Sequence, residues 1–264
     1  MEPRRVILDG RSVLYGTVGD GPDLVIVHGL SGSWRWWSLV TDRLGEHHRL
    51  HLVALPRLGR MRAGGLASWL ARFLDSGGLE RADVVGHSLG GLVAAELAAR
   101  EPSLVRRLVL VAPAGIPCGR GVLGRSLPLF EELYDVRTHL RTIVADAVRT
   151  GPVSIVHGVV YVWERDLRAE LGAVQAQTLL VWGERDRLLP ARIADEWSGL
   201  LPHATLVQLP CGHVPRWEAP DELARCMIDF LDDELADDVG DEGGSREGNG
   251  VRLVRDDDQT TRRQ

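Results

Sequence analysis

The chain has 264 residues, of which 44% are hydrophobic and 26% charged, and its formal net charge is −6. This length fits one α/β domain with an appendage, and the composition excludes a disordered or fibrous chain over residues 1–235. Eleven acidic residues and five arginines in residues 232–264 account for the whole net charge. The neutral body lacks the positive field that nucleic-acid binding needs and the basic stripe of a membrane-surface protein.

The basic residues and cysteines exclude further classes of protein and of binding site. The chain contains no lysine, which excludes P-loop proteins, pyridoxal phosphate enzymes and Ser-x-x-Lys hydrolases. Cys118, Cys211 and Cys226 are too widely spaced for a disulfide framework or a zinc site. Because metal-ligand spacings and dinucleotide glycine motifs are also absent, we expect no metal and no cofactor. With no long apolar run and no apolar signal core, we expect a cytoplasmic protein without a membrane partner.

Short apolar runs bounded by glycine or proline are typical of parallel strands buried on both faces. Such runs are Val13–Thr17, Leu24–Val27, Leu50–Leu55, Ala82–Val85, Leu108–Ala112, Thr178–Trp182 and Thr205–Leu209. Helical patterns lie between and after them, at Leu66–Leu74, Gly90–Ala99, Ala191–Leu200 and Asp221–Leu235. The alternation predicts an α/β fold, with a mostly parallel, doubly wound sheet and helices on both faces.

Two segments depart from this alternation. Residues 117–173 carry apolar and aromatic residues at irregular spacing, which predicts a short helical cap that covers the site. A pair of additional core helices is the alternative interpretation. Residues 236–264 combine low hydrophobicity with high charge, which predicts an acidic disordered tail that follows an α/β domain at residues 1–235.

The strongest chemical motif is Gly86-His87-Ser88-Leu89-Gly90, which follows a predicted strand and opens a predicted helix. A nucleophile elbow requires this context, because its serine sits on a sharp turn from strand to helix. Glycines on both sides let neighbouring backbone approach without Cβ clashes. We therefore predict Ser88 as the nucleophile.

Two further polar residues follow strand ends, in the order serine, acid, histidine. Asp186 follows Thr178–Trp182 and His213 follows Thr205–Leu209, so both loops should open at the same sheet edge as Ser88. Histidine can take the serine proton near neutral pH, and a carboxylate holds the imidazole in the required tautomer. Glu184 is the competing acid. The alternatives are that Asp186 is a surface charge or a helix cap, and that His213 is a structural loop histidine.

The remaining candidate site residues surround this predicted triad. We expect the tetrahedral oxyanion to accept hydrogen bonds from the backbone N–H groups of Leu30 and Leu89. Aromatic and histidine side chains near the elbow and in the insertion could line a substrate pocket or simply pack the insertion onto the domain. These are Trp34, His87, Tyr134, Tyr161 and Trp163.

Together, these motifs resemble the α/β-hydrolase superfamily over about Val6 to Leu235. The matching segments are Val27-His28-Gly29, the serine elbow, Val181–Asp186 and Gly212–Glu218. The resemblance implies the branch with a Ser-Asp-His triad. Dehalogenases and epoxide hydrolases are disfavoured, because they carry aspartate where Ser88 stands. Carbon–carbon hydrolases usually have tryptophan where this chain has Val214, so this difference disfavours them too.

The sequence thus favours a cofactor-free serine hydrolase that cleaves small, fairly apolar carboxylic esters through an acyl-enzyme. A carbon–carbon hydrolase or a lactonase on the same triad is the alternative, because a fold does not determine a substrate. A catalytically silent binding protein is the alternative from another class. The expected partner is a small ester-like molecule, and the oligomeric state is left open.

Overall fold

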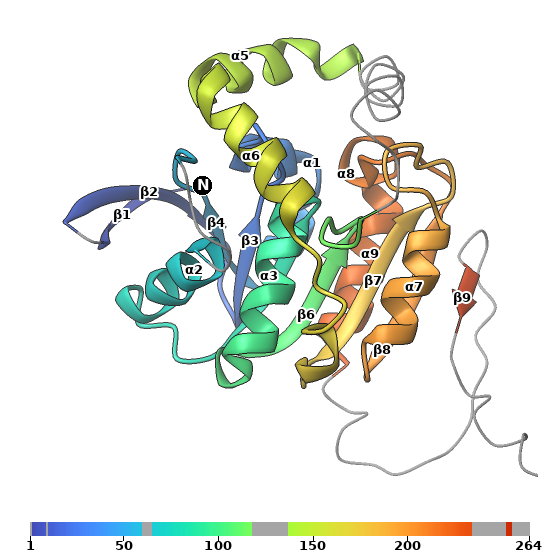
Figure 1. The fold of residues 1–264 in the computed structure, drawn as a ribbon. Helices are drawn as coiled ribbons and strands as arrows, with labels where there is room; N and C mark the ends of the chain where they lie inside the picture. Colours follow the sequence, from blue (N-terminus) through green and yellow to red (C-terminus); the bar gives the residue numbers. More distant parts are fainter. Residues whose placement is uncertain (1, 9, 60–64, 118–136, 234–251, 255–264) are drawn as a thin grey trace, which may run out of the picture.

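The structure is a computed structural model that describes residues 2–8, 10–59, 65–117, 137–233 and 252–254. Its centre is a sheet in which nine strands follow the order β1-β2-β4-β3-β5-β6-β7-β8-β9. The pairs from β4 to β8 are all parallel, whereas β1, β2 and β9 pair antiparallel at the two sides. The predicted α/β fold with a mostly parallel sheet is confirmed (Figure 1).

The strands are β1 (Glu2–Leu8), β2 (Arg11–Val18), β3 (Asp23–Val27), β4 (Arg49–Val53), β5 (Ala82–His87), β6 (Val105–Val111), β7 (Gln177–Gly183), β8 (Ala204–Leu209) and β9 (Arg252–Val254). The α-helices are α1 (Ser38–Gly45), α2 (Gly65–Ser76), α3 (Leu89–Arg100), α5 (Leu140–Thr150), α6 (Pro152–Glu164), α7 (Arg192–Leu200), α8 (Pro215–Glu218) and α9 (Pro220–Leu231). Short 3-10 helices are η1 (Trp34–Trp37), η2 (Pro102–Leu104), η3 (Arg137–His139) and η4 (Leu171–Ala173).

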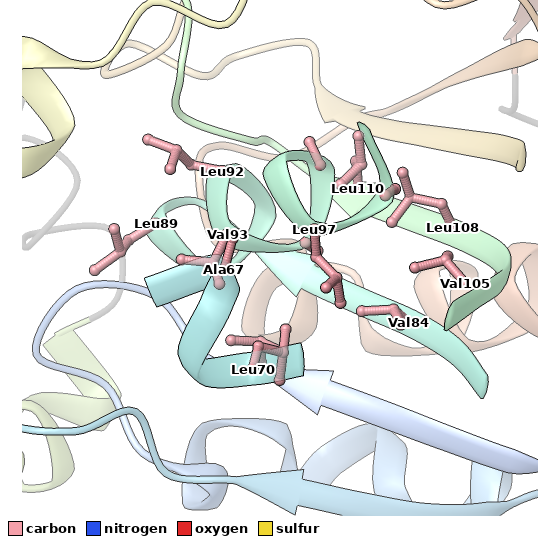
Figure 2. Packing of buried hydrophobic residues seen from close by; sticks show 14 of the residues in the cluster. Ala67, Leu70, Val84, Leu89, Leu92, Val93, Leu97, Val105, Leu108 and Leu110 are labelled. Carbon is pink, nitrogen blue, oxygen red and sulfur yellow. The ribbon is translucent and has the colours of Figure 1, made fainter. Parts of the chain in front are cut away.

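Alternate residues of the central strands face two separate cores, as the two-residue period of a strand requires. Val25 and Val27 of β3 pack on the side of α2, α3 and α7, and Leu24 and Ile26 pack on the side of α1 and α9. Figure 2 shows the first core, where apolar side chains of α2 and α3 meet those of β5 and β6. Burial on both faces explains why these strands are continuous apolar runs in the sequence.

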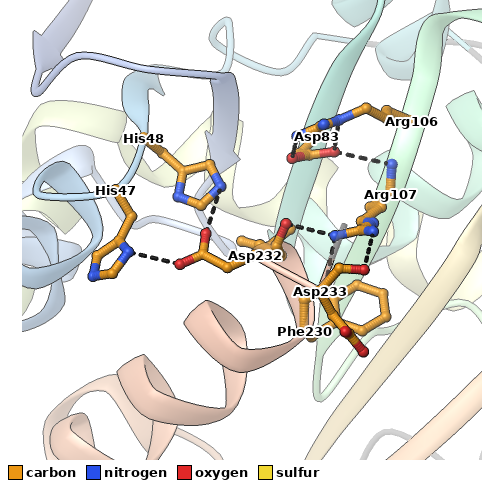
Figure 3. A network of polar contacts seen from close by, with 9 residues as sticks. His47, His48, Asp83, Arg106, Arg107, Phe230, Asp232 and Asp233 are labelled. Carbon is orange, nitrogen blue, oxygen red and sulfur yellow. Dashed lines mark hydrogen bonds and ion pairs between the residues drawn. The ribbon is translucent and has the colours of Figure 1, made fainter. Parts of the chain in front are cut away.

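The last helix ends earlier than the predicted Asp221–Leu235, because α9 stops at Leu231. The guanidinium of Arg107 donates hydrogen bonds to the carbonyls of Leu231 and Asp233 at this helix end (Figure 3). Its neighbour Arg106 forms an ion pair with the fully buried Asp83. A cation that satisfies the last carbonyls of a helix stabilises its C-terminus at that position.

The described part of the predicted insertion is mostly helical. It contains α5 and α6, which are bent by 94° at the break between them. Figure 1 shows α5 outermost at the top of the view and α6 descending toward α3. In the described part of the chain no single helix is long and apolar enough to cross a membrane, although α5 and α6 together meet that test.

Both edges of the sheet add strands that the sequence analysis did not predict. β1 pairs with β2 along its whole length. In the tail, Arg252–Val254 forms β9 and pairs antiparallel with β8. These three residues lie within the segment predicted as an acidic disordered tail, and the other residues of that segment lie outside the described ranges.

Candidate active site

The predicted nucleophile lies on a strained turn between β5 and α3. Ser88 has a φ of 53° and a ψ of −114°, a conformation that is rare for residues other than glycine. Glycine is required beside it, because a Cβ on Gly86 would lie 2.3 Å from the Gly90 carbonyl oxygen and a Cβ on Gly90 would lie 2.3 Å from the Val27 carbonyl oxygen. The turn leaves Ser88 partly exposed.

The predicted acid and base meet across two loops. His213 Nδ1 lies 2.8 Å from Asp186 Oδ2, and both residues are buried. Because the carboxylate can only accept, Nδ1 carries the proton and donates it. The other carboxylate oxygen, Oδ1, accepts from the Leu189 N–H at 2.7 Å. The competing acid, Glu184, is exposed in the same loop.

The backbone of the histidine loop is held by side chains whose role the sequence analysis missed. Glu218 Oε2 accepts from the Gly212 N–H at 2.7 Å, and Oε1 accepts from the Val214 N–H at 3.1 Å. His87 lies 2.9 Å, through Nε2, from the His213 carbonyl oxygen, to which it donates. The only signal in the sequence was the position of Glu218, five residues after the histidine. These contacts fix the backbone on both sides of the predicted base.

His87, one of the candidate pocket residues, is buried and contacts the backbone of the histidine loop. Its side chain is 2% exposed. Burial, together with the positive charge of Arg216, holds the pKa of His87 well below its usual value. The imidazole is therefore neutral near pH 7 and serves as a hydrogen-bond donor to the loop, away from solvent.

The loop predicted to supply one oxyanion donor is braced by a second buried histidine. His28 Nδ1 donates to the Gly29 carbonyl at 2.8 Å, and Nε2 accepts from the Leu55 N–H at 3.1 Å. Both ring nitrogens are thus used structurally. Leu30 follows in this loop, and Leu89 is the first residue of α3, where backbone N–H groups have no partner within the helix.

The aromatic residues predicted to line a pocket differ in their burial. Trp34 is half-buried in η1, and Trp163 is 36% exposed at the end of α6. Tyr161 is buried, and its hydroxyl lies 3.1 Å from Glu96 Oε2. Tyr134 lies outside the described residues. The three described side chains thus differ in exposure, and their assignment to one pocket stays a prediction.

Tyr161 belongs to a polar network that joins α6 to α3. Glu96 of α3 is fully buried and binds Arg165 and, at 3.1 Å, Arg100. Burial raises the pKa of the Glu96 carboxyl, and the two arginines oppose this shift. Because α3 begins directly after Ser88, the network links the cap to the helix that carries the predicted nucleophile.

A second anchor fixes α5 to the segment after the loop predicted to supply an oxyanion donor. Asp146 Oδ2 accepts from Ser33 Oγ at 2.6 Å and from Trp36 Nε1 at 2.9 Å. Its side chain is 2% exposed, and Arg35 and Arg149 each lie 3.7 Å from its Oδ1. The cap is therefore held at both of its helices by a buried carboxylate.

Arg216 is a buried cation three residues after the predicted base. Its guanidinium carbon lies 4.8, 5.6 and 5.4 Å from the ring centroids of Trp36, Trp37 and Trp217. None of the described residues accepts a hydrogen bond from its three guanidinium nitrogens. Burial lowers the pKa of Arg216 to about 9, so the group remains charged near pH 7 and raises the local positive potential.

No group of three or more potential metal-ligating side chains occurs within the ranges that the structure describes. The arrangement places a serine on a strained turn, a buried His–Asp pair and a helix N-terminus at one sheet edge. Such a set can transfer an acyl group to serine and then to water.

Fold and site together define the α/β hydrolases, and the chain belongs to this family. A sequence model described as "Alpha/beta hydrolase family" matches residues 24–226. The pimeloyl-[acyl-carrier protein] methyl ester esterase of Nitrosomonas europaea is 32% identical over 249 residues, which cover 82% of this chain and 98% of that protein. The family and its esterase relatives identify a hydrolytic enzyme.

Solved structures agree with this assignment. A bacterial membrane phospholipase A has 26% identity and a TM-score of 0.73, and the match covers 88% of this chain and 86% of that one. A meta-cleavage product hydrolase from Pseudomonas fluorescens has 19% identity and a TM-score of 0.72, with 87% and 97% covered. The second likeness concerns the fold alone.

Proposed function

We propose that the protein is a carboxylesterase that cleaves small, fairly apolar esters through an acyl-enzyme, with Ser88 as nucleophile, His213 as base and Asp186 as acid. The observation that carries this proposal is the buried 2.8 Å hydrogen bond between His213 Nδ1 and Asp186 Oδ2. It leaves Nε2 as the ring nitrogen whose lone pair can take a proton. The strained turn at Ser88 supports the role of its hydroxyl.

In the first half of the reaction, Ser88 Oγ attacks the ester carbonyl carbon and its proton moves to His213 Nε2. Asp186 stabilises the resulting imidazolium. The Leu30 and Leu89 N–H groups, together with the N-terminus of α3, stabilise the carbonyl oxygen as it becomes negative. The tetrahedral intermediate collapses, the alcohol leaves with the proton from Nε2, and the acyl group remains on Ser88.

In the second half, water attacks the acyl carbon while Nε2 accepts one of its protons. The second tetrahedral intermediate then releases the carboxylic acid, and Ser88 regains its proton from the imidazolium. The chemistry requires no bound metal or organic cofactor, because the charges that develop are met by hydrogen-bond donors and the imidazole.

The esterase relatives guide the proposed substrate class. Their names specify a methyl ester on an acyl group carried by a protein. We therefore propose esters of short alcohols, with a mainly apolar acyl chain, as substrates of this chain. The compartment that we propose is the cytoplasm, since the three cysteines of the sequence are too widely spaced for a disulfide framework.

The test is covalent labelling with a fluorophosphonate, which forms a phosphonyl adduct with an activated serine. Intact-mass spectrometry should show one adduct, and peptide mapping should place it on Ser88. The Ser88→Ala variant should remain unlabelled, and His213→Ala should react several orders of magnitude more slowly, since triad members act as a unit. A folded wild-type protein that stays unlabelled, or that reacts at another serine, would refute the mechanism.

Hydrolysis of methyl esters, a lactone and a vinylogous diketone then separates the bond types. The proposal expects methyl esters to be preferred. A higher kcat/KM for the lactone or the diketone would favour the lactonase or the carbon–carbon hydrolase on the same triad.

A further inference from the structure

The outer surface of the cap is apolar, and the proposed chemistry does not use it. On α5, Leu140, Val144 and Val148 are 49%, 52% and 77% exposed, and their four-residue spacing places them on one helical face. Further exposed apolar residues follow on α6. They are Val153, Val156, Val160 and Trp163. We call these seven residues the cap patch.

The exposure of the cap patch does not arise from a loosely held helix. The opposite face of α5 carries Asp146, which is buried and bound to Ser33 and Trp36. The inner face of α6 carries Tyr161, which is buried against Glu96. Each helix is thus fixed on its inner side, and its outer side presents large apolar groups to solvent. Exposed apolar side chains that recur along one face of each of two consecutive helices mark interaction sites.

The exposed charges of α5, which carries three members of the cap patch, are positive. Arg141 and Arg149 are exposed on α5, and the exposed Arg57 donates to the Arg149 carbonyl at 2.9 Å. The only carboxylates of α5 and α6 are Asp146, which is buried beneath the patch, and Glu164, the last residue of α6. The surface therefore combines aliphatic side chains with arginines.

We propose that the cap patch docks onto an anionic lipid surface, which revises the expectation, drawn from the net charge and the apolar pattern of the sequence, that the protein has no membrane partner. Aliphatic side chains would enter the boundary between headgroups and acyl chains, while the arginine stems extend so that their guanidinium groups reach lipid phosphates. The 94° bend between α5 and α6 fits helices that lie on a membrane rather than cross it.

Charge argues against a second copy of the chain as the occupant. In a two-fold symmetric dimer the same patch faces itself, so Arg141 and Arg149 of both copies would meet, and Glu164, at the far end of α6, is the one exposed carboxylate of the two described cap helices that could pair with them. An anionic lipid surface supplies both the apolar layer and the negative charge. This proposal is independent of the catalytic assignment, because it concerns binding alone.

The experiment measures cosedimentation of the full-length protein with vesicles of phosphatidylcholine, with and without phosphatidylglycerol. The test variant is Val148→Asp/Val153→Asp, and Arg141→Ser tests the charge. Ile7→Asp is the matched control, because Ile7 is 64% exposed on β1, outside the cap. Melting temperature and hydrolysis of a soluble p-nitrophenyl ester should be unchanged in all three variants, which shows that each is folded.

Wild type and Ile7→Asp should bind vesicles that contain phosphatidylglycerol, and the double variant should bind at least about tenfold more weakly. Arg141→Ser should lose part of the preference for phosphatidylglycerol, and salt should weaken wild-type binding. Absence of wild-type binding, or equal binding by the double variant, would overturn the proposal. A wild-type dimer that light scattering finds dissociated in the double variant would assign the patch to a protein interface instead.

Discussion

Asparagine in place of Asp186 keeps the shape of the side chain and removes one acceptor. The carboxylate now accepts from His213 Nδ1 through Oδ2 and from the Leu189 N–H through Oδ1. An amide has one carbonyl oxygen, so it can accept from only one of these donors. If its NH2 group faces His213, the ring holds its proton on Nε2, and that nitrogen cannot take the proton of Ser88.

The size of the effect follows from the burial of the pair. Asp186 is 5% exposed and His213 is 6% exposed, so water cannot replace the lost acceptor. The same substitution in triad enzymes lowers kcat by about 10⁴, which corresponds to about 5.5 kcal/mol of transition-state stabilisation. We expect a loss of this order for Asp186→Asn. KM should change little, because the acid does not contact the substrate.

Glu184→Gln is the matched control, since Glu184 lies in the same loop and is exposed. The assay is steady-state hydrolysis of p-nitrophenyl acetate, with circular dichroism melts to show that each variant is folded. Glu184→Gln should retain near-wild-type kcat. The assignment of the acid is wrong if Glu184→Gln is the substitution that lowers kcat most, or if Asp186→Asn keeps more than about a tenth of the wild-type kcat.

Other perturbations test the architecture around the site. Asp146→Ala should reduce the free energy of unfolding in urea by about 2–4 kcal/mol, because two buried donors lose their acceptor. The control Asp166→Ala, at an exposed residue, should change this free energy by about 0.5 kcal/mol or less. Equal effects of the two substitutions would show that α5 is not anchored at Asp146. Arg216→Met should raise the free energy of unfolding at neutral pH by roughly 1–3 kcal/mol, because it removes a buried cation without a hydrogen-bond partner in the described structure. A lower free energy of unfolding in this variant would mean that stacking of the guanidinium on tryptophan stabilises the fold by more than burial of the charge destabilises it. Burial lowers the pKa of His28 and His87, so at acidic pH these histidines bind protons in the unfolded chain but not in the native state. The free energy of unfolding should therefore fall as the pH drops below about 6.5. Urea midpoints that stay constant from neutral to acidic pH would contradict this.

The parts of the fold nearest the site could be predicted because they obey local rules. The strands that lead to Ser88, Asp186 and His213 are continuous apolar runs, since each is buried on both faces. Parallel strands place their carboxyl ends at one edge, so the order of motifs implied that Asp186 and His213 would meet. By contrast, β1 is mostly exposed and charged, and an edge strand of that kind leaves no apolar run in the sequence.

The cap could not be predicted in the same way. Trp163 was one of the residues expected to line a pocket, and its side chain is 36% exposed. The spacing of residues along a helix tells which side chains share a face, but not whether that face meets the core or solvent. The contacts that decide this, between Asp146 and Ser33 and between Tyr161 and Glu96, join residues far apart in the chain.

The two-sided construction of α5 separates two kinds of evolutionary constraint. Its inner face carries Asp146, where a substitution would disturb Ser33 and Trp36, in the segment that follows the predicted oxyanion loop. Its outer face carries Val144 and Val148, which are exposed and belong neither to the core nor to the proposed triad. Mutations can therefore accumulate on the outer face while turnover is conserved. Relatives that share the anchor could diverge in the surface or partner that they meet without a change in the bond that they cleave.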